Sequence, residues 1–217
     1  MTEDRFSQEF GADFRKTEGL VYKEFDRTKH VFQDTDLIQP DGTERHGIIE
    51  RMAGIDFGYT NPTAAVEIWR DSDDNYWVVS EWYKTGKTNA EVIEYVKTLK
   101  VNQVYPDPAE PDRIEEMERA GINVREVSKD VEKGIDSVRH LFKNGRLKIH
   151  HKCYNLIQEL ETYSYKERRP LQNEPEEPIK ENDHALDALR YALYMQQPIA
   201  YVKPQKRSMA FEGNLTY

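Results

Sequence analysis

The spacing of apolar residues predicts a run of strands in the first half of the chain's central region. Three segments rich in aromatic and β-branched residues follow one another at 51–59, 63–70 and 76–83, a composition typical of β-strands. The connections between them are short and polar, as at 71–75. Turns this short allow only antiparallel pairing, so we expect a three-stranded meander.

From residue 88 onward the apolar positions repeat with the period of a helix. Val92 and Val96 lie at helical spacing within 88–100, and Thr88 or Asn89 is a suitable N-cap. The further predicted elements, in chain order, are a strand at 101–105, a helix at 111–120, a strand at 122–127, and helices at about 132–143, 151–163 and 183–197. A meander followed by alternating units predicts an α/β fold with a mixed five-stranded sheet flanked by helices.

The two ends of the chain differ in composition from its centre. Residues 1–50 are polar and irregular, and we expect them to form a lead-in or linker. Residues 51–198 contain the predicted elements and are expected to form one domain. Residues 199–217 are expected to form a flexible polar tail.

Composition narrows the classes of protein to which the chain can belong. Hydrophobic residues make up 37% of the 217 residues, which suffices for one buried core. No apolar stretch approaches the ~20 residues that span a bilayer, and residues 1–16 lack the apolar region of a secretory signal. We therefore expect neither a membrane protein nor a secreted one. The single cysteine, Cys153, excludes a disulfide framework and a multi-cysteine zinc site, and we expect it to be a buried apolar residue.

The charge balance counts against a general affinity for nucleic acid. The chain has 31 Lys and Arg against 40 Asp and Glu, a net charge of -9. An overall negative field repels DNA and RNA. Any nucleic-acid role must therefore rest on a local basic patch, on metal ions or on a partner that holds the strand.

Two aspartates lie within or at the end of predicted strands, where a charged side chain is uncommon. Asp56 follows Ile55 inside an apolar strand, where a lone carboxylate is costly unless a cation or another group compensates its charge. Asp107 stands between two prolines where the fourth predicted strand stops, the end of a sheet at which α/β folds bind ligands. The alternative is that each aspartate only stabilises a turn.

A third acidic group begins the last predicted helix. Asp183, His184 and Asp187 are spaced so that all three can share one edge of that helix, about one turn (~5.4 Å) apart. Acidic residues suit the first turn of a helix because of its dipole, which explains Asp183. Asp187 lies a turn further in, among apolar residues, and this explanation fits it poorly.

The order of the elements predicts that these positions meet. Asp56, Asp107 and Asp187 would converge on one end of the sheet. Carboxylates crowded together repel one another and need protons or divalent metal at neutral pH. Oxygen ligands without thiolates suit Mg²⁺ or Mn²⁺.

Three motifs carry a resemblance to a known family. GIDFGYTNPTAA, VYPDPAEP and ENDHALDALRYAL, in this order and spacing, resemble the nuclease domain of the large terminase subunit of tailed bacteriophages. The resemblance covers about residues 19–198. It implies an RNase H-like (retroviral integrase) fold.

The resemblance also implies roles for the acidic residues. Asp56, Asp107 and Asp187 would be the catalytic triad and would bind two Mg²⁺ or Mn²⁺ ions. His184 would be an additional ligand or a proton-handling group, and Asp183 is a further candidate ligand. Two such ions can activate a water and stabilise the leaving oxygen of a phosphodiester. Because Asp56 lies on a central strand, we expect it to bridge both ions.

The same resemblance implies an activity, its partners and its place. The activity is endonucleolytic cutting of concatemeric viral double-stranded DNA during genome packaging. The implied partners are the terminase ATPase domain of the same full-length chain, the small terminase subunit and the portal protein, in the host cytoplasm at the procapsid portal. The segment GLVYKEFDRTKHV resembles the connection between the ATPase and nuclease domains.

Five basic residues are candidate contacts to DNA phosphates. Lys129 and Lys133 follow the predicted strand at 122–127. Lys166, Arg168 and Arg169 lie where the family has a β-hairpin near the site. Solvated surface charge is the alternative for each of them.

Other functions share parts of these patterns. Residues 84–88 follow a strand and precede a helix like a phosphate-binding Walker A loop, but the required first glycine is replaced by Glu81. Sugar kinases and actin-like ATPases share the Asp-x-Gly motif but need a second such domain, and they leave Asp187 without a role. Another RNase H-like nuclease of the resolvase or transposase type, or a non-catalytic module that docks DNA or the portal, stays open.

Overall fold

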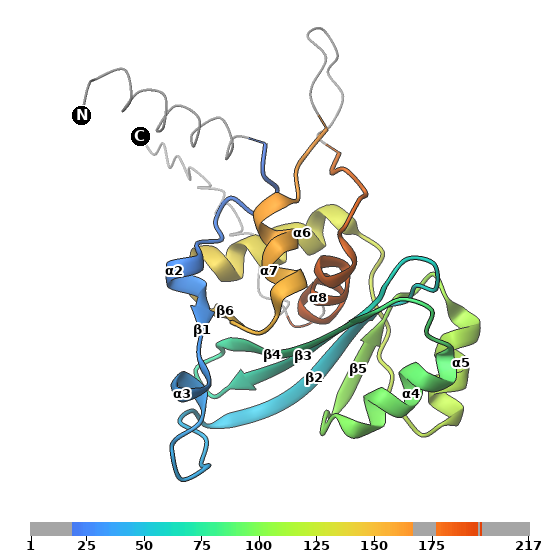
Figure 1. Cartoon of the computed structure of the whole chain (residues 1–217), viewed down its shortest axis with the longest axis horizontal. Coiled ribbons are helices and arrows are strands. Elements are labelled where there is room, and N and C mark those ends of the chain that lie inside the picture. Colours follow the sequence, from blue (N-terminus) through green and yellow to red (C-terminus); the bar gives the residue numbers. More distant parts are fainter. Residues whose placement is uncertain (1–18, 167–176, 195, 197–217) are drawn as a thin grey trace, which may run out of the picture.

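A single mixed sheet organises the computed structural model, which describes residues 19–166, 177–194 and 196 (Figure 1). Its six strands are β1 (Val31–Phe32), β2 (Ile48–Asp56), β3 (Thr63–Asp71), β4 (Tyr76–Lys84), β5 (Gln103–Pro106) and β6 (Leu147–His150). They lie in the order β1-β6-β4-β3-β2-β5. The antiparallel pairing of β2 with β3 and of β3 with β4 confirms the meander, while β5, β6 and β1 add parallel strands.

Helices cover both faces of this sheet. They are α2 (Arg27–His30), α3 (Asp34–Leu37), α4 (Asn89–Thr98), α5 (Pro111–Arg119), α6 (Val131–Lys143), α7 (Tyr154–Thr162) and α8 (His184–Tyr194). Figure 1 shows α6, α7 and α8 together on one face, with α4 and α5 on the other. The α/β class and the flanking helices are therefore confirmed. None of the helices in the described part of the chain combines the length and apolarity needed to cross a bilayer.

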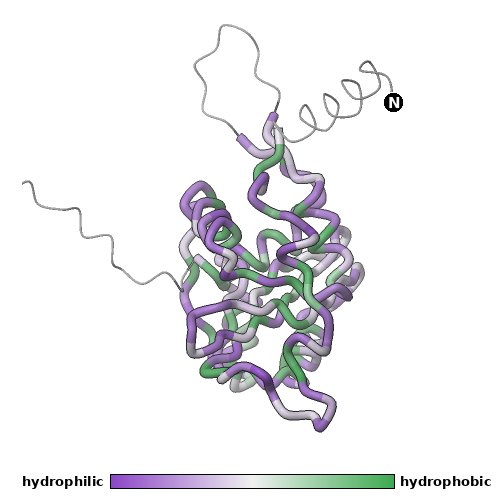
Figure 2. The backbone as a smooth tube through the Cα atoms, turned by 90° about the vertical axis from the view of Figure 1, so that its left-hand side faces the viewer, coloured by the Kyte–Doolittle hydropathy of each residue, from purple (hydrophilic) through white to green (hydrophobic). Residues whose placement is uncertain are grey.

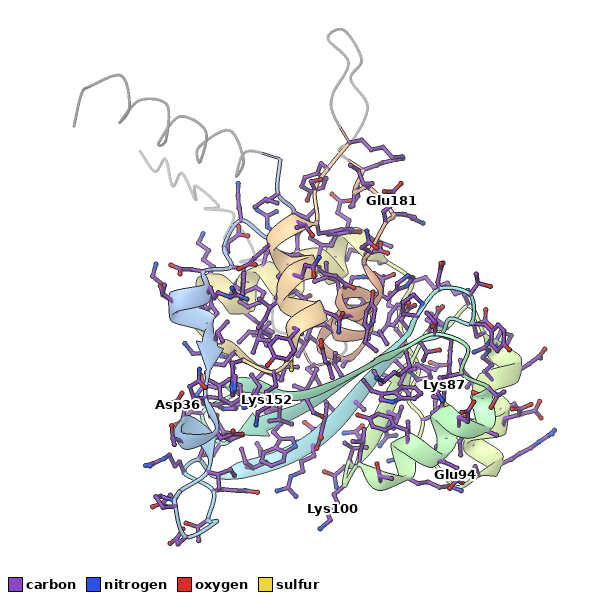
Figure 3. The ribbon with its side chains drawn as sticks, viewed as in Figure 1. Asp36, Lys87, Glu94, Lys100, Lys152 and Glu181 are labelled. Carbon is purple, nitrogen blue, oxygen red and sulfur yellow. The ribbon has the colours of Figure 1, made fainter. Side chains whose placement is uncertain are left out.

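Polar and apolar residues separate as a folded core requires. Figure 2 shows hydrophobic segments mostly within the body of the molecule and hydrophilic segments along much of its outside. Charged side chains such as Glu94 and Lys100 point outward, away from the sheet (Figure 3). Cys153 is fully buried in the main hydrophobic cluster, and burial raises the pKa of its thiol. It is a core residue, as predicted.

Local capping fixes the start of α4. Thr88 and Glu91 form a reciprocal capping box, in which the Glu91 carboxylate accepts the Thr88 N–H at 3.0 Å. Thr88 is thus the N-cap, one of the two residues predicted for that role. Lys84 ends β4, and residues 85–88 connect it to α4, with Thr88 as the N-cap of the helix.

The predicted strand at 122–127 is wrong, and the sheet has six strands instead of five. Only an isolated parallel bridge between Val104 and Val124 forms there. Pro106, the last residue of β5, has no N–H with which to extend a ladder. The sequence analysis did not predict β6, which follows a Gly145 turn with φ of 67°.

The expected lead-in contributes to the core. Val21 and Tyr22 are 0% and 2% exposed and belong to the main hydrophobic cluster. Glu24 accepts two hydrogen bonds from the guanidinium of Arg139 on α6, at 2.8 and 3.0 Å. How the chain divides into domains stays a prediction, and the expected tail at 199–217 lies outside the described residues.

Candidate active site

Asp56 is the last residue of β2, a strand held between β3 and β5. Ile55 and Phe57 belong to the cluster that packs on the α4 and α5 side. Asp56 points to the other face, as the alternation of side chains along a strand requires. It is only 8% exposed. Its backbone position is therefore fixed from both sides by neighbouring strands.

Gly54 lets α8 approach this strand closely. A Cβ atom at Gly54 would lie 1.8 Å from the carbonyl oxygen of Ala188, a distance that no side chain can tolerate. Gly54 and Asp56 share one face of β2 because they are two residues apart. The close approach places the first turns of α8 against Asp56.

The start of α8 and the residue before it supply further groups of the site. The Nδ1–H of His184 donates to Oδ2 of Asp56 at 2.9 Å. One turn on, Arg190 donates from Nη2 to Oδ1 of Asp187 at 2.9 Å. Asp183 precedes the helix, and its carboxylate accepts the hydroxyl of Tyr163 at 3.3 Å.

Asp107 approaches from the neighbouring strand. Pro106 ends β5, and the N–H of Asp107 donates to the carbonyl of Ile55 at 2.8 Å, which anchors it beside the end of β2. Its Oδ1 accepts the N–H of Ala109 at 2.8 Å. This short-range bond is a turn of the kind expected for an aspartate between prolines.

One cavity of about 600 Å³ unites these positions at the end of the sheet. Its lining includes every acidic and histidine residue singled out from the sequence: Asp56, Asp107, Asp183, His184 and Asp187. Residues up to 131 positions apart in the chain, Asp56 and Asp187, thus share one space. The structure brings the predicted positions together, while their roles stay predictions.

Burial and crowding raise the proton affinity of the site. Burial raises the pKa of Asp56 to about 6, repulsion from Asp187 and Asp107 adds to the rise, and the hydrogen bond from His184 opposes it. Burial also raises the pKa of Asp187, against the neighbouring Arg190. The hydrogen bond to Asp56 in turn raises the pKa of His184. Each buried carboxylate is thus offset by one basic side chain.

The donor chemistry of the cavity fits Mg²⁺ or Mn²⁺. Among the described residues, four carboxylates and no thiolate line it, and hard divalent cations prefer oxygen ligands. In the described part of the chain, no three Asp, Glu, His or Cys side chains are yet grouped closely enough to hold an ion. Asp56 is hydrogen-bonded to His184, and Asp187 to Arg190. Metal binding would require these carboxylates to change partners.

The predicted basic residues divide into three groups. Lys129 lines the cavity. Lys133 and Lys166 instead form ion pairs, with Asp130 and Glu177 respectively, both at 2.7 Å. Arg168 and Arg169 lie outside the described residues.

Two basic residues of the cavity were not predicted. Lys180 lines it from the segment before α8, and Arg190 lies within α8 itself. Arg190 is 4% exposed and stands three residues after Asp187, so helical spacing could have suggested their pairing. Lys180 has no such signal, because the chain around it is irregular.

Comparison with known proteins points to one family. The family described as the terminase RNaseH-like domain matches residues 53–196. The large terminase subunit of Escherichia phage T5 is 28% identical over 216 residues, which cover 89% of this chain and 46% of that protein. The chain spans less than half the length of the curated relatives that it matches.

Solved structures show the same fold. The nuclease domain of the P22 large terminase has a TM-score of 0.65 and 22% identity, covering 82% of this chain and 92% of that one. The nuclease domain of the SPP1 large terminase, g2p, solved with bound Mn, has a TM-score of 0.60 and 20% identity, covering 77% and 97%. At these identities the likeness shows a shared fold, which agrees with the match to the terminase RNaseH-like domain.

Proposed function

The chain belongs to the family of terminase RNase H-like domains, and from this membership we propose that it is a metal-dependent endonuclease domain. In this proposal it cuts concatemeric viral double-stranded DNA when genome packaging starts and when the capsid is full. The observation that carries the proposal is the convergence of Asp56, Asp107 and Asp187 on one cavity. The SPP1 nuclease domain crystallised with Mn supports the choice of cation.

The three aspartates would hold two Mg²⁺ or Mn²⁺ ions. Asp56, held between two neighbouring strands, would be one ligand, together with Asp107 and Asp187. When bound, such ions supply activation of a water and stabilisation of the leaving oxygen at phosphorus. The chain itself provides fixed oxygen donors at the ends of two neighbouring strands and on one helix.

His184 and Arg190 would balance the acidic charge of the site. His184 holds a proton at Nδ1, 2.9 Å from Asp56, and so orients that carboxylate. Arg190 does the same for Asp187 from within α8. His184 lines the cavity and would be the group that handles a proton there, and Asp183 is a further candidate ligand.

Basic groups of the cavity would contact the DNA backbone. Lys129 and Lys180 lie on its lining, and phosphate contacts from lysine position a strand without reading its sequence. The proposal includes Lys133 and Lys166, whose ion pairs are exposed at the surface and therefore weak. The net charge of -9 suggests that partners or other domains bring the DNA to this site.

Those partners are proposed from the family. The match covers 46% of the phage T5 large terminase subunit, so that protein is more than twice as long as its matched part. We propose that an ATPase domain, the small terminase subunit and the portal protein act with it. The proposed setting is the host cytoplasm at the procapsid portal.

A plasmid-nicking assay tests the proposal. Supercoiled plasmid is incubated with the chain plus Mn²⁺, Mg²⁺ or EDTA, together with Asp56→Ala, Asp187→Asn and the matched control Asp73→Asn. Asp73 is an exposed aspartate of the β3–β4 turn. We expect metal-dependent nicking by the wild type and the control and none by the two site variants.

The pattern of results separates the alternatives. We expect faster nicking with Mn²⁺ than with Mg²⁺, because Mn²⁺ tolerates a less ideal octahedron in a site without its partner domains. Preference for branched junctions over linear duplex would favour a resolvase-type nuclease. Intact plasmid that is nevertheless bound would refute the nuclease and favour a docking module.

A further inference from the structure

The N-terminal turn of α8 carries two residues of the candidate site and needs acceptors for its backbone. The first N–H groups of a helix have no partner within the helix. Asp183, the residue before α8, accepts the hydroxyl of Tyr163 at 3.3 Å through Oδ2. The N–H of Leu186 in this turn bonds to an acceptor on another helix.

Glu159 of α7 provides it. Its Oε2 accepts the backbone N–H of Leu186 at 2.9 Å, and its Oε1 accepts the hydroxyl of Tyr83 on β4 at 2.8 Å. The residue is 3% exposed, so water does not compete for these bonds. A carboxylate at a helix N-terminus also interacts favourably with the helix dipole. One side chain thus ties β4, α7 and α8 together.

A glutamate from the sheet holds the first turn of α7 in the same way. Glu81 of β4 accepts the N–H groups of Asn155 and Leu156 in the first turn of α7, both at 2.9 Å. Cys153, the N-cap of α7, makes no capping bond through its side chain. Glu159 is therefore itself held in place, because its helix is anchored to the sheet.

We infer that Glu159 is a positioning residue of the active site, holding the first turn of α8 so that His184 and Asp187 face Asp56. This inference rests on the proposed nuclease function. Glu159 does not line the cavity, and it would act on the reaction only through α8. The neighbouring Leu186 stands between His184 and Asp187 in the same turn, so movement at its N–H moves both.

The test compares four proteins with the wild type. Glu159→Leu removes both acceptor oxygens and keeps an apolar side chain in the buried space. Glu159→Gln keeps one acceptor oxygen for Leu186. Tyr83→Phe removes only the hydroxyl that holds Glu159. Asp71→Asn is the control. Asp71 ends β3 away from the cavity, is only 1% exposed, and accepts a hydrogen bond from Trp77 Nε1 at 2.9 Å.

Two readouts are taken: hydrogen exchange of the α8 amides without metal, and kcat and KM for plasmid nicking. We expect Glu159→Leu to speed exchange at Leu186 and Asp187 and to lower kcat by about 10- to 100-fold, the effect of a displacement near 1 Å. KM for DNA should stay close to the wild-type value. Glu159→Gln should keep both kcat and α8 exchange close to their wild-type values. Tyr83→Phe should change kcat and α8 exchange in the same direction as Glu159→Leu, but by less.

The control decides whether lost stability alone is responsible. Asp71→Asn should lower the melting temperature while leaving kcat and α8 exchange unchanged. The inference is overturned if Glu159→Leu, like the control, leaves kcat and α8 exchange unchanged. If Glu159→Leu does not fold, the same criterion applies to Tyr83→Phe. If the wild type itself fails to nick DNA, the proposed function fails, and α8 exchange alone still decides whether Glu159 holds the helix.

Discussion

Asp56 shows how one buried charge constrains the residues around it. It is 8% exposed, and its pKa is raised to about 6, first by burial and then by repulsion from Asp187 and Asp107. The imidazole of His184 compensates part of that cost through a 2.9 Å hydrogen bond. The remaining cost is what a cation bound at the carboxylates would remove.

Asp56→Asn should therefore stabilise the metal-free protein while abolishing its response to metal. At pH 8 the buried charge is present, and its removal should raise the free energy of unfolding by about 1–3 kcal/mol, since one pKa unit corresponds to about 1.4 kcal/mol. Urea unfolding in EDTA measures this gain. Mg²⁺ should stabilise the wild type but not the variant. A variant less stable than the wild type in EDTA would contradict the reasoning.

Glu159 predicts a dependence of stability on pH with a definite sign. Burial raises its pKa from 4.5 to about 7, and the groups facing it are the Tyr83 hydroxyl, the Leu186 N–H and the ring of His184. Because the folded state has the higher pKa, this contribution to stability is fully present below pH 4.5 and is lost as pH rises through about 7.

Glu159→Gln should remove that dependence. We expect the urea midpoint of the variant, relative to the wild type, to rise between about pH 5 and about pH 8. The raised pKa of His184 causes a loss in the same direction, and the charge of Glu159 contributes to that rise. The difference between the two proteins therefore reports Glu159 together with its effect on His184, and a constant difference across this range would argue against the raised pKa of Glu159.

At the scale of elements, the placement of α8 decides the geometry of the site. Three contacts from different elements hold it. Ala188 lies against Gly54 of β2. The side chain of Arg190 packs against Gly134 of α6, where an added Cβ would lie only 2.5 Å from its Cγ. Glu159 of α7 caps the first turn of α8. The helix therefore has little freedom to shift along the sheet.

Gly54→Ala should disturb this placement. Its Cβ would meet the Ala188 carbonyl at 1.8 Å, and because that carbonyl is backbone and cannot rotate away, α8 must move. We expect a loss of about 1–3 kcal/mol in stability and a fall in nicking rate on the order of 100-fold. Gly19→Ala is the matched control, since nothing lies within 4 Å of its Cβ. Wild-type nicking by Gly54→Ala would show that α8 placement is not critical.

At the scale of the whole molecule, segments far apart in the chain close one core. The N–H of Val21 donates to the carbonyl of Tyr163 at 2.9 Å, and the ring of Tyr22 stacks on that of Tyr163 with centroids 6.2 Å apart. Figure 1 shows α2 and β1 along the edge of the sheet beside β6. The segment before the meander is thus part of the packed structure.

Tyr22→Ala tests how much this segment contributes. Truncating a buried aromatic residue should lower the free energy of unfolding by about 3–5 kcal/mol. The control Tyr154→Ala removes a tyrosine that is 66% exposed and should change stability little. Urea unfolding of both variants provides the comparison. Equal small effects would mean that residues 19–26 dock loosely on an independently stable nuclease core.

The sequence by itself determined the features that depend on neighbouring residues. Strand composition and short turns predicted the meander, and helical spacing with a suitable N-cap predicted the helix that follows Thr88. Their positions at a strand end and within a helix singled out Asp107 and Asp187, which the structure places in one cavity with Asp56. The motif resemblance added the RNase H-like fold.

Tertiary structure alone decided the features that join distant segments. Local periodicity does not show that β6 pairs in parallel with β4, or that Pro106 halts the pairing of β5 and leaves only a bridge at Val124. Nor does it show that Glu159 caps α8 or that Lys180 reaches the cavity. Such contacts depend on which surfaces meet when the chain packs, and side chains close in space leave no periodic signal when they lie far apart in sequence.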